Sequence, residues 1–169
     1  MSRFTVLMAL TIFAADTALP TAGAGPYGFD LLDREGKANT GLGGLMVIDG
    51  HVFVANEPGQ DLWYFHSVEG GQVIKLRGGP HSGYLTSDAE GRVFLTEKAE
   101  EGSYWETQCD GVPTFKTAFI ARWRRDGHWV LTADEETSTY TDKAGRKYKV
   151  RKVRLTPKGS VFRGGLVAP

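Results

Sequence analysis

A histidine beside a serine is the first pair of side chains in this sequence that could do chemistry. The pair is His81 and Ser82, within Gly79-Pro80-His81-Ser82-Gly83. A serine hydrolase needs an activated nucleophile, and the usual elbow sets its serine at the centre of G-x-S-x-G ahead of a helix. Ser82 lies outside such a motif, and the Gly and Pro residues favour a connecting loop. The sequence therefore predicts no catalytic residues and a protein that is not an enzyme.

Histidines could also ligate a metal. The chain has four, at positions 51, 66, 81 and 128, scattered along its length. A metal site requires several His, Cys, Asp or Glu side chains at ligand spacing. His51 and His128 each follow an Asp-Gly pair, which is typical of a turn at the surface. We expect no metal ligands and no other cofactor.

Charge is unevenly distributed although the formal net charge is zero. Residues 143–163 contain nine basic residues and no acidic one. Lys147, Lys149 and Arg151 are therefore candidate ligand-binding residues, for a polyanion such as a sulfated glycan. The alternative is a lysine-rich strand that protects a sheet edge from pairing with other chains. The neutral overall balance gives no reason to expect a nucleic acid as a partner.

Aromatic side chains outside the expected core could stack on sugars. Tyr64 and Tyr104 are the candidates for this role and complete the set of candidate ligand-binding residues. Trp123 alternates with Phe119 and Ala121, a spacing that places the three on one face of a strand and favours core packing.

The first 24 residues have the features of a secretory signal peptide. Arg3 precedes an uncharged apolar run over residues 4–15, and Ala22-Gly23-Ala24 offers a small-x-small cleavage site. We expect cleavage after Ala24 and secretion, either extracellular or periplasmic. The run is shorter than the about 20 residues that span a membrane, and no later segment qualifies. The one cysteine, Cys109, cannot close an intramolecular disulfide.

The elements that would position these residues are β-strands. No segment after the leader shows the apolar rhythm of an amphipathic helix. Short segments rich in Val, Phe, Thr and Trp alternate instead with turn dipeptides such as Asp49-Gly50, Asp110-Gly111 and Asp126-Gly127. The prediction is an all-β protein. Residues 25–44 are interpreted as a lead-in segment with a first strand at Tyr27, Phe29 and Leu31.

A repeat appears when every second turn is superposed. Apolar residues follow Gly50, Gly91 and Gly127, and an aromatic residue comes 13 or 14 positions after each glycine. This defines three units of two hairpins, over residues 45–77, 83–117 and 118–155. The expected core consists of the apolar residues at matching places in the units: Val52, Val54, Trp63, Val93, Leu95, Trp105, Trp129, Leu131 and Tyr140.

Three units with a period of about forty residues resemble the β-trefoil superfamily, which includes the ricin-type lectins. The resemblance implies that residues 45–169 form one β-trefoil domain. Another antiparallel β-barrel or a sandwich is the alternative, and a propeller is disfavoured because three blades are too few. The Gln-x-Trp signature of the lectins would fall at Trp63 and Trp105, where this chain has Asp61-Leu62-Trp63 and Ser103-Tyr104-Trp105. No sugar-site residue is therefore carried over.

The predicted function is that of a secreted, non-catalytic binding module for carbohydrate, similar to a lectin. The alternative is a secreted protein-protein interaction module, such as a protease inhibitor or an effector. In that case the polar connections over residues 96–104 and 133–139 are the expected contact loops. The expected partner is a glycan or an extracellular protein.

Overall fold

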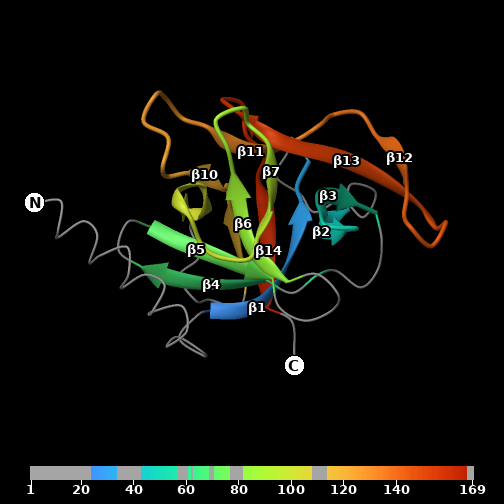
Figure 1. The fold of residues 1–169 in the computed structure, drawn as a ribbon, viewed down its shortest axis with the longest axis horizontal. Helices are drawn as coiled ribbons and strands as arrows, with labels where there is room; N and C mark the ends of the chain where they lie inside the picture. Colours follow the sequence, from blue (N-terminus) through green and yellow to red (C-terminus); the bar gives the residue numbers. More distant parts are fainter. Residues whose placement is uncertain are drawn as a thin grey trace, which may run out of the picture.

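The computed structural model describes residues 24–33, 43–56, 61, 63–68, 71–76, 82–107 and 114–166 (Figure 1). These residues form fourteen strands and one short 3-10 helix, and the prediction of an all-β protein is confirmed. The elements are β1 (Ala24–Leu31), β2 (Gly44–Ile48), β3 (His51–Ala55), β4 (Trp63–Val68), β5 (Gly71–Leu76), β6 (Gly83–Ser87), β7 (Val93–Thr96), η1 (Glu101–Ser103), β8 (Trp105–Glu106), β9 (Thr114–Thr117), β10 (Ile120–Ala121), β11 (Val130–Ala133), β12 (Ser138–Thr141), β13 (Lys147–Thr156) and β14 (Phe162–Leu166).

The hairpin of β2 and β3 shows how local sequence sets the turns. Ile48 pairs with His51, so the loop between the strands contains only Asp49 and Gly50. Both residues have positive φ, 50° and 80°, as a two-residue turn compatible with the strand twist requires. The Asp-Gly turn expected at this place is confirmed.

The strands close into an antiparallel barrel. β1 pairs with β14 on one side and with β4 on the other, and β4 pairs with β5. The circuit continues from β5 to β8 and from β8 to β10. β10 follows β9 in the chain, and β9 pairs with β14, which returns the circuit to β1. In the part of the chain that the structure describes, every strand of this circuit except β9 pairs with at least two others.

Three antiparallel strand pairs meet at one end of this barrel. They are the hairpins of β2 with β3 and of β6 with β7, and the pair of β11 with β13. β3 pairs with both β7 and β13, and a bridge between Arg92 and Arg154 joins the other two pairs. Segments far apart in the sequence are thereby held side by side.

The structure corrects the predicted ricin-type β-trefoil with three units beginning at residues 45, 83 and 118. The strands form the closed antiparallel barrel that was the stated alternative, and the barrel includes β1, which precedes the first of those units. Tyr27 and Phe29 of β1 are fully buried, so this strand is central to the packing. The physical reason for the error is that spacing along the chain does not fix which distant strands share hydrogen bonds.

One apolar cluster fills the barrel and contains most of the predicted core. Its buried members include Val52, Val54, Trp63, Trp105 and Leu131, and partly buried Val93, Leu95 and Trp129 pack against them. The indole nitrogen of Trp105 donates to the Leu85 carbonyl at 2.9 Å, and that of Trp63 to the Leu45 carbonyl at 3.4 Å. Both tryptophans are therefore buried with their one donor satisfied.

Aromatic rings occupy the centre of this cluster. Phe29 lies 5.1 Å from Phe119 and 5.5 Å from Phe65, and Tyr27 lies 5.0 Å from Phe115, all between ring centroids. The rings meet edge to face, the arrangement that aromatic pairs prefer.

A second cluster corrects the expectation for Tyr140. It joins β2, β3 and the hairpin of β12 and β13, and Tyr140 packs here with Phe53 and Val150, outside the barrel core. The cause is that β12 belongs to a hairpin that folds against β3, away from the barrel interior.

Residues 1–23 of the predicted signal peptide (1–24), together with His81 and Cys109, lie outside the described residues. Among those that are described, no helix has the length and apolar character needed to cross a bilayer.

Candidate functional site

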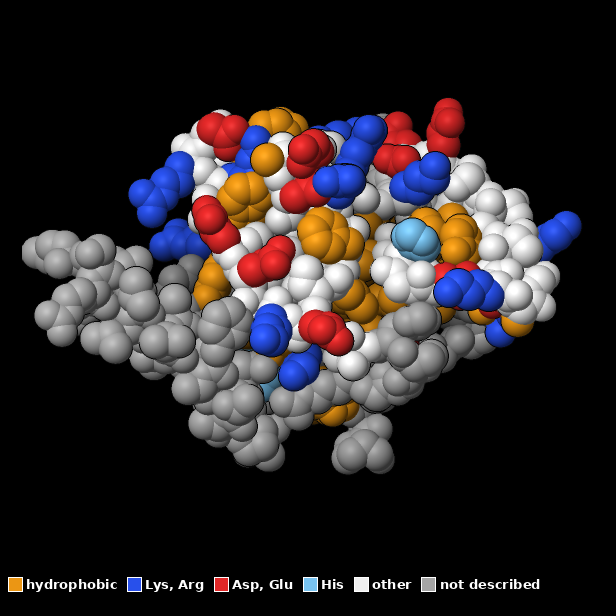
Figure 2. All heavy atoms as spheres, in the orientation of Figure 1, with side chains coloured by type: hydrophobic (Ala, Val, Ile, Leu, Met, Phe, Trp, Pro, Cys, Tyr) orange, Lys and Arg blue, Asp and Glu red, His pale blue; other side chains and the backbone are white. Residues whose placement is uncertain are grey.

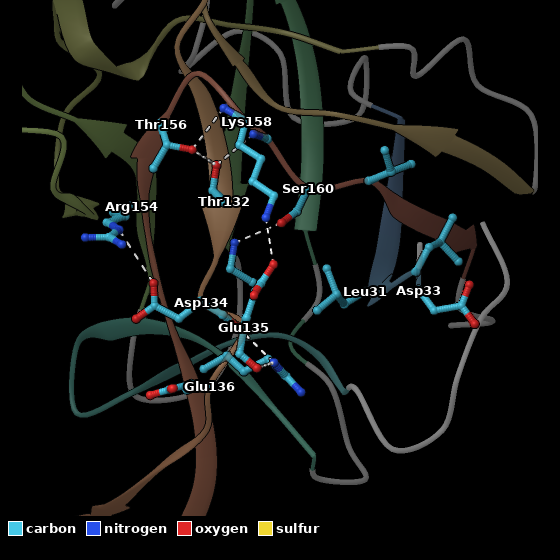
Figure 3. Close-up of a pocket in the computed structure, with 15 residues that line it drawn as sticks. Leu31, Asp33, Thr132, Asp134, Glu135, Glu136, Arg154, Thr156, Lys158 and Ser160 are labelled. Atoms are coloured by element: carbon cyan, nitrogen blue, oxygen red, sulfur yellow. Dashed lines mark hydrogen bonds and ion pairs between the residues drawn. The ribbon is translucent and has the colours of Figure 1, made fainter. Parts of the chain in front are cut away.

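A groove opens where the ends of several strands meet beside β11 and β13 (Figure 3). Its cavity volume is about 930 Å³. The lining comes from the end of β1, the end of β11 with the turn after it, β13, and the connection into β14. The residues are Leu31, Leu32, Asp33, Thr132, Ala133, Asp134, Glu135, Glu136, Arg151, Arg154, Thr156, Lys158, Gly159, Ser160 and Val161.

β13 forms one wall of the groove. The side chains on one face of this strand are buried in the core at its C-terminal end and reach the surface towards its N-terminal end. Leu155 and Val153 belong to the barrel cluster. Since side chains alternate along a strand, Arg151 points to the same side one step further out. It pairs with Val54 of β3, which is fully buried. The guanidinium group therefore lies at the rim of the core, where the groove begins.

Hydroxyl groups hold the connection between β13 and β14 against β11. Thr132 Oγ1 lies 2.6 Å from Thr156 Oγ1 and accepts a hydrogen bond from the Gly159 backbone N–H at 3.0 Å. Ser160 Oγ accepts from the Ala133 backbone N–H at 2.9 Å. Gly159 has φ +77°, a conformation that glycine adopts at little cost. These contacts fix the far wall of the groove.

Charges of both signs face each other in the groove. Lys158 Nζ lies 2.7 Å from Glu135 Oε1, and Arg154 Nε lies 3.5 Å from Asp134 Oδ1 (Figure 3). Glu136 has no ion-pair partner among the described residues. The groove therefore offers both cationic and anionic groups to a ligand.

Arg151 ties the acidic turn to β13. Its Nη1 donates to the backbone carbonyl of Asp134 at 2.9 Å and also to that of Glu135. Its Nε is buried and has no hydrogen-bond partner within the described part of the chain. A buried donor without an acceptor is uncommon in folded proteins, so the hydrogen-bonding capacity of this guanidinium is not used up.

Apolar side chains complete the lining. Leu31 and Leu32 are buried at the end of β1, whereas Val161 is 47% exposed. In the described part of the chain, Val161 and Leu166 are the two large hydrophobic residues that are exposed. One of the two thus lies at the groove.

The five candidate residues from the sequence divide into two groups in space. Lys147 and Lys149 share a face of β13 with Arg151, which lines the groove. Tyr64 lies on β4, opposite Lys75 of β5. Tyr104 packs against a small cluster with Val73, Tyr84 and Ala99, and burial raises the pKa of its hydroxyl. The structure does not bring the tyrosines to the basic residues.

Only part of the lysine-rich segment is paired on both sides. Residues 150–152 of β13 pair with β3, whereas Lys147 and Lys149 pair with Thr141 and Thr139 of β12. β12 lies at one end of the sheet and contains no charged residue. Edge protection by Lys147 and Lys149 therefore stays a prediction.

Sequence reasoning missed the acidic side of the groove. Asp134, Glu135 and Glu136 form an acidic run inside the polar connection over residues 133–139, which was interpreted as a contact loop. This acidic run could have indicated a polar surface site, because three adjacent carboxylates require cations or solvent nearby. What the sequence did not indicate is that Lys158 and Arg154 would supply the cations.

A second polar cluster surrounds Trp123, whose predicted core packing is confirmed. The Arg124 guanidinium lies 4.0 Å from the Trp129 ring centroid and 5.7 Å from that of Trp123. Arg124 also forms an ion pair with Asp126 at 2.7 Å. The hydrogen bond from Arg124 lowers the pKa of the Asp126 carboxyl. Because Arg124 already occupies the space beside both indoles, this cluster stabilises the turn.

No three His, Cys, Asp or Glu side chains come together as a metal site within the ranges that the structure describes. His51 lies against Phe53 and Tyr140, and His128 is exposed in the connection between β10 and β11.

No protein family model matches the chain, and no curated protein sequence matches it. Among solved structures, the chain is similar to the lysenin pore, with a TM-score of 0.55 and 14% identity over 85% of this chain and 46% of that chain. It is also similar to lysenin in complex with phosphocholine, with a TM-score of 0.57 and 12% identity over 86% of this chain and 45% of that chain. The chain thus spans about half the length of lysenin. At this identity the likeness concerns the fold, and the predicted resemblance to ricin-type lectins is corrected to a likeness to lysenin.

Proposed function

We propose that this chain is a secreted, non-catalytic binding domain that takes the zwitterionic head group of a lipid, of the phosphocholine kind, in the groove beside β13. One observation carries the proposal: a single groove presents guanidinium, ammonium and carboxylate groups next to apolar side chains. A zwitterionic head group carries one charge of each sign on a short linker, and its lipid continues into an apolar chain.

The two halves of the ligand have suitable partners. Arg154 and Lys158 would exchange their ion pairs with Asp134 and Glu135 for a phosphate, since charge-assisted hydrogen bonds to phosphate are among the stronger polar contacts in proteins. Glu136, which lacks an ion-pair partner among the described residues, can attract the quaternary ammonium group. Val161 at the mouth of the groove provides apolar contact where the glycerol and acyl chains would leave. Lysenin, whose fold this chain shares in part, has been solved in complex with phosphocholine.

Isothermal titration calorimetry with soluble phosphocholine tests the proposal. We expect binding that Arg154→Gln and Glu136→Gln each weaken roughly tenfold, as expected for one charge-assisted contact. Glu106→Gln removes an exposed carboxylate on β8 and serves as the matched control, with unchanged affinity. Choline and inorganic phosphate, titrated separately, should each bind more weakly than phosphocholine. Absence of binding by the unmodified chain would reject the proposal.

Carbohydrate binding is the second candidate, favoured by the hydroxyl and carboxylate groups in the same groove, such as Thr156 and Glu136. Among the described residues that line the groove, none is aromatic and could stack on a sugar. A glycan array separates the two candidates, because a glycan ligand that phosphocholine does not displace would favour the carbohydrate. An extracellular protein partner is the remaining prediction, and a pull-down from extracellular fluid tests it.

A further inference from the structure

We propose that the outward face of the β12–β13 hairpin is a docking surface for an anionic lipid membrane. The hairpin comprises β12, β13 up to Val150, and the turn between them. This inference goes beyond the proposed function, because it requires no head group in the groove and concerns a different lipid charge.

The hairpin extends beyond the barrel at one end of the molecule (Figure 1). Over residues 138–150 it contains four basic residues, Lys143, Arg146, Lys147 and Lys149, and one acidic residue, Asp142. Figure 2 shows Lys and Arg side chains at the same end of the surface. A projecting element with this charge balance attracts anions.

The register shows which side chains face outward. Tyr140 pairs with Tyr148, and both pack inward against the cluster of Phe53 and Val150. Lys147 and Lys149 alternate with these residues and are exposed. Their cross-strand partners are Thr141 and Thr139, which lie on the same face as the lysines. The outward face is therefore a row of ammonium groups flanked by hydroxyls.

The charge on this face is not neutralised within the described residues. Lys147 and Lys149 have no ion pair there, whereas the Asp142 carboxylate accepts hydrogen bonds from the Ala144 and Arg146 backbone N–H groups and from the Tyr148 hydroxyl. These contacts hold Asp142 in the turn, away from the outward face. The two lysines thus remain available to an external anion.

The row leads directly to the groove, and this favours a lipid surface over a soluble polyanion. Lys147, Lys149 and Arg151 follow one another on the same face at a spacing of about 7 Å, and Arg151 lines the groove. A flat anionic surface that contacts the lysines therefore also reaches the groove mouth, where Val161 is exposed. Lysine side chains act as flexible point charges, which suits an array of mobile head groups.

Vesicle flotation tests the docking surface. The vesicles consist of phosphatidylglycerol alone, so that they are anionic and present no zwitterionic head group to the groove. We expect the full chain to bind them at low salt, and the double variant Lys147→Gln with Lys149→Gln to bind roughly 25-fold more weakly, at about fivefold per lysine. The matched control is Lys98→Gln with Lys116→Gln, two exposed lysines elsewhere, which should bind as the unmodified chain does.

Two other outcomes of the vesicle experiment would contradict the docking surface. Equal binding by the two double variants would overturn the proposal, and so would binding of a soluble sulfated oligosaccharide that depends on Lys147 and Lys149 without any binding to vesicles. Circular dichroism of both variants establishes that they are folded. Phosphocholine titration separates the two proposals, since the hairpin variant should keep its phosphocholine affinity and Glu136→Gln should keep its vesicle binding.

Discussion

At the scale of single residues, Asp126 couples a surface charge to the tryptophan cluster. The hydrogen bond from Arg124 lowers the pKa of this carboxyl below its ordinary value of about 3.9. The stabilisation from the carboxylate is therefore fully present above the unfolded-state pKa and is lost as the pH falls through the folded-state pKa. We predict that Asp126→Asn lowers the unfolding free energy more at pH 7 than at pH 3, which lies below the unfolded-state pKa. Urea unfolding at the two pH values measures this, and a destabilisation of equal size at both would contradict the assignment.

The two buried tryptophans provide a comparison at the same scale. Both are fully buried, but the indole hydrogen bond is 2.9 Å for Trp105 and 3.4 Å for Trp63. Phenylalanine removes similar volume at each site, so the difference between the variants reports the hydrogen bond. We predict that Trp105→Phe is more destabilising than Trp63→Phe by about 1 kcal/mol, measured by chemical denaturation. The reverse order would indicate that cavity size, not the hydrogen bond, decides the cost.

One of the candidate ligand-binding residues lies at the groove. Arg151 was a candidate and lines it, because a cluster of basic residues is visible in the sequence. The acidic partners were not predicted, because the contact between Glu135 and Lys158 joins residues 23 positions apart. Such a pair depends on β11 and β13 being adjacent, which residue spacing alone does not reveal.

At the scale of elements, β13 shows that the alternation of polar and apolar side chains indicates a buried face only when the neighbouring strands are known. The odd-numbered residues pass from Leu155 in the barrel core to Arg151 at the groove and on to the exposed Lys147. The even-numbered Tyr148 and Val150 pack on the second cluster. One ten-residue strand thus faces two cores on opposite sides. A sequence pattern that mixes lysine, tyrosine and valine in this way does not indicate which face is buried.

β14 offers a test of close packing between elements. A Cβ atom on Gly164 would lie 2.6 Å from the Phe115 ring and 2.9 Å from the Phe29 ring, whereas one on Gly165 would meet nothing within 4 Å. We predict that Gly164→Ala destabilises the protein by about 1–3 kcal/mol, because the rings must shift. Gly165→Ala is the control and should change stability by less than about 0.5 kcal/mol. Thermal unfolding of both variants checks the pair, and equal effects would contradict the packing described.

At the scale of the whole molecule, the sequence predicted the fold class but not the connectivity. Val, Phe and Trp segments between Asp-Gly turns indicated strands, and hairpins such as β2 with β3 follow directly from a turn of two residues. The pairings that close the barrel join strands that are far apart in the sequence. β1 pairs with β14, residues more than 130 positions apart, and no local pattern specifies such a partner. The predicted strand at Tyr27, Phe29 and Leu31 is confirmed as β1, but the prediction placed it in a lead-in segment outside the units that start at residue 45.

The central place of β1 leads to a prediction for the entire chain. Phe29 is fully buried and contacts the rings of Phe65, Phe115 and Phe119, which lie on other strands or between them. Since one cluster joins these elements, Phe29→Ala should lower the unfolding free energy by about 3–5 kcal/mol and shift tryptophan fluorescence and far-UV circular dichroism together. Leu166→Ala, at a residue that is 49% exposed, should have little effect. If the two probes separate in the unmodified protein, or if Phe29→Ala shifts one of them alone, β1 is not part of a single cooperative core.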